Sequence, residues 1–372
     1  MTDTQSHQSD TQSHESNVAD RLGPTLSRRS GGWLVAVFAG IVVAALMGVV
    51  HLPYAVLQPG PVVNTLGNGT GGKPLITVQG KATYPTSGAL DFTTVSVLGG
   101  PNNRVNVWEW ITGHLDRTNS VVPEDVLFPK GVTSTQVDQQ NAAEMADSQQ
   151  EAIAVALRGL GHVVPEVVTV RELAKDSPAS GVLRTGDVLV SIEGKAVTTP
   201  DGVRAAVRAH KPGDKAIFTV RRDGKKLVLS VKTADSQGHT VVGIFLQASF
   251  DFPFKVSINA GDVGGPSAGM MFSLAVYDKL TPGALTGGAA IAGTGTVNSA
   301  GAVGSIGGIR QKMVGAKRGG ASWFLAPAGN CDEVVGHIPD GLRVVKVSTF
   351  TQARDAVESI AAKKTTSLPT CG

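Results

Sequence analysis

The longest uninterrupted apolar stretch of the chain comes early, at residues 31–50, "GGWLVAVFAGIVVAALMGVV". It contains no charged residue, and as a helix it would be long enough to cross the roughly 30 Å hydrocarbon layer of a membrane. The alternative, a cleaved signal peptide, needs an apolar core of about 7 to 15 residues and a small-x-small cleavage site, and neither fits well. The pattern therefore predicts a retained transmembrane helix over residues 31–52.

Shorter runs of alternating apolar and polar residues follow the long one. The segments "LITVQG" and "LDFTTVSVLG" predict strands, and "VNVWEWITGHL" predicts a helix. Apolar residues at helical spacing, Ile153, Ala156, Leu157 and Leu160, predict further helix between residues 133 and 161. Residues 55–150 are therefore expected to form a region of strands and helices.

A separate unit is predicted over residues 160–235. The segments "PEVVTVREL" and "AIFTVRRDGKKLVLSVKTA" predict strands, the second one a hairpin that turns at "RDGK", and "PDGVRAAVRAH" predicts a helix. Because this unit has its own strands, turn and helix, it is expected to fold as a domain.

The residues before the predicted transmembrane helix indicate its orientation in the membrane. Residues 1–30 carry a tandem heptad, "DTQSHQS" and "DTQSHES", whose polar composition predicts a disordered tail. Arg21, Arg28 and Arg29 precede the apolar run, and no Lys or Arg follows it closely. By the positive-inside bias the tail stays in the cytoplasm and the remainder lies outside the cytoplasmic membrane.

Composition narrows the fold class and the classes of partner. The chain has 372 residues, with 33 basic and 30 acidic residues spread without long basic runs, so nucleic-acid binding has no support. The 46 glycines and 19 prolines indicate many turns and short strands rather than a helical bundle. We therefore expect an α+β fold.

The chain contains two cysteines and no convincing cofactor motif. Cys331 and Cys371 are too far apart for a zinc signature; in an oxidising exterior they form a disulfide, and otherwise they are two unpaired thiols. "GNGTGGK" at 67–73 resembles a phosphate-binding loop, but Pro74 stands where that loop needs Ser or Thr. No metal and no cofactor is therefore expected.

The stretch "GPSAG" around Ser267 fits the G-x-S-x-G pattern of esterases. That mechanism needs a buried parallel strand directly before the serine, and an acid and a histidine after it. The preceding "FPFKVSINAGDVG" alternates instead, and only His337 lies downstream. The esterase interpretation is therefore disfavoured.

A lysine offers a different partner for this serine. In "GGIRQK" Lys312 lies near the start of a predicted helix, and a lysine kept neutral in a dry pocket can take the proton of a serine. Lowering an ammonium pKa from about 10.4 to near 7 requires roughly 4 to 5 kcal/mol of differential interaction, so burial must accompany the loss of charge. The motif predicts a Ser267–Lys312 dyad if Lys312 is buried.

The residues after the serine predict the oxyanion site. "SAGMMFSLAVYDKL" has a helical apolar face, so Ser267 is expected to start a helix whose free N–H groups point at the reacting carbonyl. The backbone N–H of Ser267 is the first candidate donor, with those of Gly265 and Ala268 as alternatives. Pro266 has no N–H to donate.

Two stretches also resemble known families. "SPASGVLRTGDVLVSIEGKAV" resembles PDZ domains of the bacterial protease-associated type, which bind a peptide end as an added strand. The resemblance implies that residues 160–235 dock substrate or partner tails, with "GLGHVV" at 159–164 as the candidate loop for the terminal carboxylate. A purely structural role for this domain is the alternative.

The C-terminal part resembles the proteolytic domain of the Lon family of Ser-Lys peptidases. The resemblance rests on "GGPSAGMMFSLAVYDKLTPGALTGGAAIAGTGTV", "GGIRQK" and "IPDGLRVVKVSTFTQARDAV", and it implies a domain over 240–362 with residues 363–372 as a tail. It implies Ser267 as nucleophile, Lys312 as general base and Thr294 as the hydroxyl beside the amine. An ordinary strand residue is the alternative for Thr294.

Together these features resemble membrane-anchored, PDZ-containing Lon-like proteases without the ATPase module. The resemblance implies a proteolytic domain interrupted by the PDZ insert, peptide or protein substrates, and a hexamer. Many ATP-dependent relatives carry an acid three positions before the serine, where this chain has Gly264. The alternative function is a membrane-anchored PDZ scaffold that does not cut.

Overall fold

The computed structural model describes residues 28–69, 72–101, 103–129, 131–236 and 238–372. The predicted tail 1–30 therefore lies outside the described residues up to position 27. By its internal contacts the chain divides into two units. One holds the N-terminal residues to Leu52 with 106–108, and the other holds Pro53–Val105 and Glu109–Gly372.

The first unit is built on helix α1 (Arg28–Val49), which precedes the short strand β1 (His51–Leu52). Within it the indole N–H of Trp108 donates to the carbonyl oxygen of Ala44 at 3.1 Å. Over the described residues, no helix combines the length and the apolar character that a membrane crossing needs. The transmembrane helix predicted at 31–52 is therefore not supported there.

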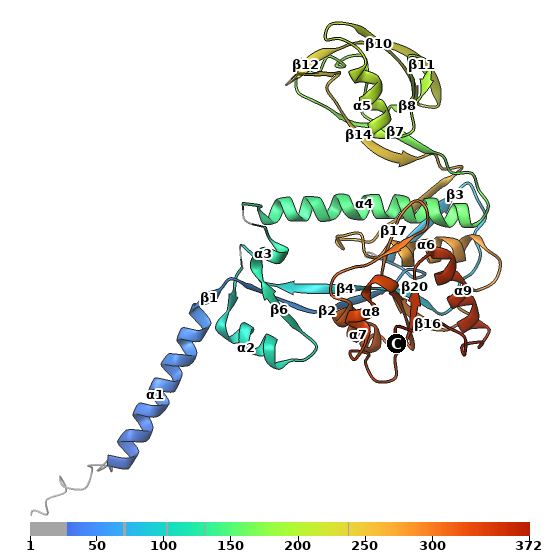
Figure 1. Ribbon diagram of the computed structural model, residues 1–372. Coiled ribbons are helices and arrows are strands. Elements are labelled where there is room, and N and C mark those ends of the chain that lie inside the picture. Colours follow the sequence, from blue (N-terminus) through green and yellow to red (C-terminus); the bar gives the residue numbers. More distant parts are fainter. Residues whose placement is uncertain (1–27, 70–71, 102, 130, 237) are drawn as a thin grey trace, which may run out of the picture. The chain divides into compact units, whose positions relative to one another are not determined.

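The second unit contains a six-stranded sheet, the main sheet, with strand order β20-β19-β16-β4-β2-β6 (Figure 1). β4, β16, β19 and β20 run parallel, whereas β2 and β6 join antiparallel. Its strands are β2 (Tyr54–Asn64), β4 (Ala89–Leu98), β6 (Ser120–Pro123), β16 (Ala290–Gly293), β19 (Trp323–Pro327) and β20 (Arg343–Val347). Early and late segments thus share one sheet, as expected for a domain interrupted by an insert.

Helices cover both faces of the main sheet. The longer ones are α4 (Ser134–Gly159), α6 (Gly269–Leu280), α7 (Ile309–Arg318) and α9 (Phe350–Ala361), and the shorter ones are α2 (Val107–Leu115), α3 (Glu124–Leu127) and α8 (Cys331–Val334), which follows the 3-10 turn η2 (Ala328–Asn330). Alternate residues of a strand point to opposite faces. Leu325 accordingly joins the core of α4, α6 and α9, while Phe324 joins the core of α7.

Local sequence explains where α4 begins. Thr133 and Gln136 form a capping box, in which each side chain accepts from the other's backbone N–H. The predicted apolar positions Ile153, Ala156 and Leu157 are buried. The helix predicted between 133 and 161 is confirmed.

The insert, residues 166–250, forms a second sheet with strand order β11-β10-β8-β7-β14. Its elements are β7 (Glu166–Leu173), β8 (Val188–Ile192), β9 (Lys195–Ala196), α5 (Pro200–Arg208), β10 (Lys215–Arg222), β11 (Lys225–Lys232), β12 (Ala234–Ser236), β13 (His239–Val241) and β14 (Ile244–Phe250). The hairpin predicted at "RDGK" joins β10 to β11. Helix α5 starts where the Thr199 hydroxyl caps the N–H of Gly202.

Short strand pairs complete the second unit. β3 (Ile76–Gln79) pairs with β15 (Lys255–Ile258), and β17 (Thr296–Val297) pairs with β18 (Val303–Gly304). β5 (Val105–Asn106) leads into α2. Both helices and sheets are thus substantial, so the chain is of mixed α+β type.

Candidate active site

Ser267 lies in the turn before α6, and two segments, residues 294–295 and α4, hold that turn. Its carbonyl oxygen accepts from the N–H of Gly295 at 2.8 Å and from the hydroxyl of Thr294 at 3.0 Å. On the other side the Ser148 hydroxyl of α4 donates to the carbonyl oxygen of Pro266 at 2.9 Å. The position of the Ser267 side chain is thus set by contacts that are distant in sequence.

The start of α6 differs from the prediction. The helix begins at Gly269 rather than at Ser267, because the Ser267 carbonyl is already bound to Thr294 and Gly295. A side chain on Gly269 would bring a Cβ within 2.7 Å of the Ser148 hydroxyl oxygen. Glycine at this position therefore lets α4 and α6 pack closely beside the serine.

Lys312 points from the first turn of α7 to this serine. Its Nζ lies 2.8 Å from the Oγ of Ser267 and 3.1 Å from the Oγ1 of Thr294. The residue is 4% exposed, and no ion pair joins it to a carboxylate of the described residues. Burial lowers the pKa of Lys312 to about 8, because the charged form is poorly solvated there. The structure therefore brings together all three side chains named from the sequence.

The first turn of α7 is placed by glycine. Gly308 precedes the helix with a φ of 70°, and a Cβ there would lie 2.7 Å from a methyl of Val95 on β4. A left-handed conformation with no room for a side chain suits glycine alone. Gly308 of "GGIRQK" thus allows the start of α7, which carries Lys312, to pack closely against β4.

The Thr294 hydroxyl has a defined direction. It donates to the Ser267 carbonyl oxygen, so toward Lys312 it acts as an acceptor. Thr294 is 0% exposed and follows β16 directly. If the amine of Lys312 is neutral and donates one N–H to Thr294, its nitrogen lone pair stays free to interact with another group.

The three candidate oxyanion donors differ in availability. The N–H of Gly265 already donates to the carbonyl oxygen of Asn141 on α4 at 2.9 Å, so this candidate is engaged. The N–H groups of Ser267 and Ala268 donate to no residue in the described part of the chain. Two donors therefore remain beside the serine hydroxyl.

A cavity of about 400 Å³ opens at the serine. It is lined by Pro61, Phe92, Thr93, Thr94, Val95, Ser96, Met145, Asp262, Val263, Gly264, Ser267, Ala268, Gly307 and Lys312. Ser267 and Lys312 thus face one space together with part of β4. A peptide segment entering this space would meet the serine.

Gly264 lies at a second close approach of α4 to the serine turn. A Cβ there would lie 2.8 Å from the Cβ of Asn141, a separation that forces one of the two to move. The acid that resembling proteases carry at this position would not fit without a shift of α4. Nothing in the sequence pointed to Asn141 or Ser148, because their contacts are long-range.

The predicted carboxylate loop at 159–164 is wrong. The N–H groups of Leu160, Gly161 and His162 donate back to carbonyls of α4 and so end that helix. The groove of the insert lies instead between α5 and β14, with a volume of about 620 Å³. No residue of 159–164 lines it.

The segment Val242–Gly243 forms part of that groove, and its carbonyl oxygens accept hydrogen bonds from residues 174–179. The Val242 carbonyl accepts from the hydroxyl of Ser177 and the N–H of Ala179, and the Gly243 carbonyl accepts from Ala174. The N–H groups of Val242 and Gly243 donate to no described residue. Ser177 and Ala179 of the "SPA" motif thus hold the backbone of this loop at the groove.

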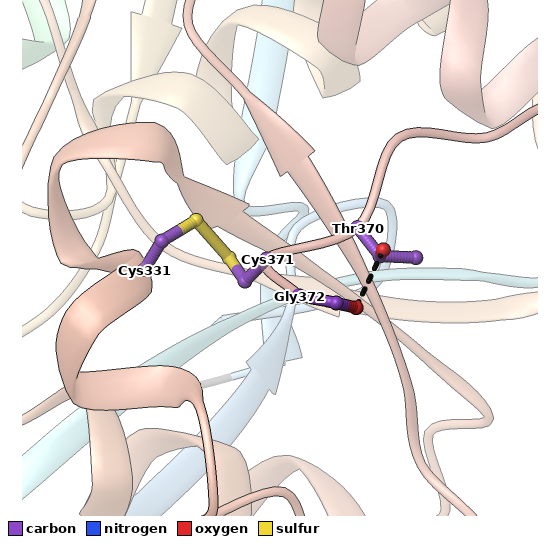
Figure 2. The surroundings of a disulfide bond; sticks show 4 residues. All are labelled: Cys331, Thr370, Cys371 and Gly372. Carbon is purple, nitrogen blue, oxygen red and sulfur yellow. Dashed lines mark hydrogen bonds between the residues drawn. A yellow bond between two sulfur atoms is a disulfide. The ribbon is translucent and has the colours of Figure 1, made fainter.

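The two cysteines form a disulfide that joins α8 to the C-terminal tail (Figure 2). The bond links Cys331 to Cys371 across 40 positions. Of the two alternatives left open by the sequence, the paired one is present. Over the described residues, no group of three or more acidic, histidine or cysteine side chains gathers that could hold a metal ion.

Comparison with known families finds two matches within the chain. Residues 131–233 match the PDZ domain family, and residues 250–362 match the Lon protease (S16) C-terminal proteolytic domain. The groove residues 240–246 lie after the end of the first match, which stops at residue 233.

One curated protein and several solved structures resemble parts of the chain. The mitochondrial Lon protease homolog of Debaryomyces hansenii is 31% identical over 101 residues, which cover 25% of this chain and 9% of that protein. The chain thus spans a small part of its curated relative. The solved PDZ domain of an SdrC-like protein from Listeria monocytogenes is 27% identical over 21% of this chain and 85% of its own, with a TM-score of 0.20. A solution structure from Geobacillus thermodenitrificans is 27% identical over 20% and 84%, with a TM-score of 0.18.

Proposed function

We propose that this chain, which carries a PDZ domain and a Lon-type (S16) proteolytic domain, is a serine endopeptidase with Ser267 as nucleophile and Lys312 as general base. The observation that carries the proposal is the 2.8 Å separation between the Lys312 Nζ and the Ser267 Oγ, with Lys312 buried. No acid or histidine is needed for this chemistry, because a neutral amine accepts the serine proton directly.

The acylation step follows from the geometry. The Oγ of Ser267 attacks the scissile carbonyl while its proton passes to the Nζ of Lys312. The N–H groups of Ser267 and Ala268, which have no other described acceptor, are placed to stabilise the oxyanion. The resulting ammonium of Lys312 then gives its proton to the leaving amine, and an acyl-enzyme remains.

Deacylation uses the same residues in reverse. The amine of Lys312 takes a proton from water while the water oxygen attacks the acyl carbon. The ammonium of Lys312 then returns this proton to the Oγ of Ser267 as the acyl–Oγ bond breaks, which frees the acid product and the serine hydroxyl. Thr294 keeps the amine directed at the serine, since its hydroxyl accepts an N–H of Lys312. The proposed substrates are exposed peptides or loosened protein segments, docked by the PDZ domain.

The proposal is tested with the full chain in detergent and a fluorescent unstructured protein such as casein. We expect Ser267→Ala and Lys312→Ala each to lower kcat/KM by about a thousandfold or more. The matched control is Lys317→Ala, since Lys317 lies on the same helix but is exposed. Undiminished cleavage by both dyad variants would refute the assignment.

The rival function is a PDZ scaffold that does not cut, favoured by the separate groove of the insert. The two functions differ in the reactivity of the serine. A fluorophosphonate probe should label wild type at Ser267 and leave Lys312→Ala unlabelled. Absence of labelling in the wild type would favour the scaffold.

The proposed location is the outer side of the cytoplasmic membrane. It is supported by the uncharged run 31–50 behind Arg21, Arg28 and Arg29, and by the disulfide, which persists in oxidising compartments. Protease added to intact spheroplasts should degrade the catalytic region; protection would contradict this location. The hexamer implied by the Lon resemblance is part of the same proposal, and light scattering of the full chain tests it.

A further inference from the structure

The groove of the insert runs along an open sheet edge. β14 is the terminal strand of its sheet and pairs with β7 on one side (Figure 1). Its other edge pairs with no strand among the described residues. An extended peptide can hydrogen-bond to such an edge as one more strand.

All charged residues that line the groove are basic. Its apolar lining includes Val203 and Val207 of α5 with Ile244 and Leu246 of β14. Its charged lining consists of Arg171, Arg204 and Arg208, and no Asp or Glu contributes. The groove therefore combines apolar pockets with positive charge alone.

Two of these arginines are not neutralised by a neighbour. Arg204 pairs with Asp201, one turn back on α5. Arg171 and Arg208 form no ion pair within the described part of the chain. Arg208 stands on α5, and Arg171 stands on β7, across β14 from its free edge. Both line the groove in which an added strand would lie.

We propose that this groove selects extended peptide ends that carry acidic residues just before an apolar C-terminal segment, with Arg171 and Arg208 as the specificity-determining residues. The inference rests on the proposed docking function and adds the chemical class of the ligand. Carboxylates of the peptide would meet guanidinium groups, which favour this partner through paired, charge-assisted hydrogen bonds. Basic tails would be rejected by like charge.

Residues 369–371 are not the occupant. Cys371 is bonded to Cys331, and the carbonyl of Pro369 accepts from the N–H of Lys346 on β20. The last residues are thus fixed in the proteolytic domain. The ligand is expected to come from another protein.

The test uses the full chain with Ser267→Ala, so that peptides are not cleaved. Two fluorescein-labelled ten-residue peptides end in Val-Ala-Val and differ in the three positions before it, with Glu in one and Gln in the other. By fluorescence anisotropy we expect the Glu peptide to bind about tenfold more tightly at low salt, with the difference shrinking as salt screens the charges.

The variants assign the selectivity to the groove. Arg171→Gln with Arg208→Gln should reduce the preference to about twofold or less, because both of these charges are gone. The matched control is Lys226→Gln, an exposed residue on β11 at the opposite edge of the sheet, which should keep the tenfold preference. Thermal melts of the variants should match the parent, since the exchanged side chains are exposed.

Two results would overturn the inference: equal binding of the Glu and Gln peptides, or equal loss of selectivity in the groove and control variants. Its failure is separable from that of the proposed function. Casein hydrolysis by the wild type without peptide selectivity would refute the groove alone. Selective binding without hydrolysis would refute the peptidase and leave the groove in place.

Discussion

Thr294 meets Lys312 as a hydrogen-bond acceptor, because its hydroxyl proton is committed to the carbonyl oxygen of Ser267. The amine of Lys312 must therefore use one N–H for Thr294, which turns its lone pair toward the serine. Thr294→Val should lower kcat by about tenfold to a hundredfold with little change in KM. Stopped assays on casein with the full chain measure both.

Thr294→Ser is the conservative control for that prediction. It keeps the hydroxyl and should recover most of the lost kcat, while an unfolding midpoint within a few degrees of the parent shows that packing is intact. Equal activity of the Val variant and the wild type would show that Thr294 serves the fold alone.

The pH dependence of kcat/KM should report Lys312. Its pKa is lowered to about 8 by burial, and the active species carries the neutral amine. The rate constant should therefore rise with pH, reach half its maximum near pH 8 and fall about tenfold for each unit below. A profile that stays flat between pH 6 and 9 would exclude this lysine as the base.

The burial of Lys312 also determines how this residue affects the pH dependence of the free energy of unfolding. The pKa of Lys312 is lower in the folded than in the unfolded chain, so the unfolded state binds more protons between the two values. This residue therefore contributes stability that rises with pH from about 8 to about 10.4. Lys312→Met should remove that contribution to the pH dependence of unfolding, measured by denaturant titration at several pH values.

The proximity of Ser267, Thr294 and Lys312 could be predicted from the sequence because each of them lies in a local motif. "GPSAG", "AGTG" and "GGIRQK" carry the turn, the strand end and the helix start, and the structure brings Ser267, Thr294 and Lys312 within hydrogen-bond distance. The strands and the long helix α4 could also be predicted from the sequence, since periodicity and capping are local properties.

Features that depend on distant contacts could not be predicted. Ser148 lies 118 positions from the residue it holds, and the start of α6 is displaced because Gly295 takes the Ser267 carbonyl. The sequence offered 159–164 only as a candidate for the carboxylate loop, whereas the groove is lined by 240–246 beside α5. Strand order, which local sequence does not specify, decides that location.

The contact between Gly264 and Asn141 yields a paired prediction. Gly264→Ala places a Cβ 2.8 Å from that of Asn141 and should push α4 away from the serine turn, lowering kcat/KM by about tenfold. Asn141→Gly in the same chain removes the opposing Cβ and should restore most of the activity. If the Ala variant alone is fully active, the close approach has no catalytic consequence.

The disulfide should contribute to stability rather than to chemistry. Cys331 and Cys371 close a loop of 40 positions, so their removal should lower the free energy of unfolding by about 2 to 4 kcal/mol. Denaturant titrations of the wild type with and without reductant measure the loss. A chain with both cysteines replaced by Ala should be insensitive to reductant, and an unchanged midpoint of reduced wild type would contradict the expected contribution.

Asn330, which precedes the disulfide-bonded Cys331, forms hydrogen bonds to the turn before α7, the helix that carries Lys312. It is 2% exposed; its Oδ1 accepts from the N–H of Ile306 at 2.9 Å, and its Nδ2 donates to the Ile306 carbonyl at 2.8 Å. Ile306 opens the turn that leads through Gly308 into α7. Asn330→Ala leaves both backbone groups of Ile306 without their partner, which costs about 1 to 3 kcal/mol for each buried group left unsatisfied.

We expect Asn330→Ala to lower kcat by about tenfold while KM changes little, because Lys312 is displaced but the substrate cleft remains. Asn298→Ala, in an exposed turn, is the matched control and should leave kcat unchanged. The pH profile separates positioning from folding, since a displaced Lys312 in a wetter site should shift the half-maximum above pH 8, toward the ordinary pKa of lysine. If kcat and the profile both stay at wild-type values, Asn330 stabilises its own turn and has no role in placing the base.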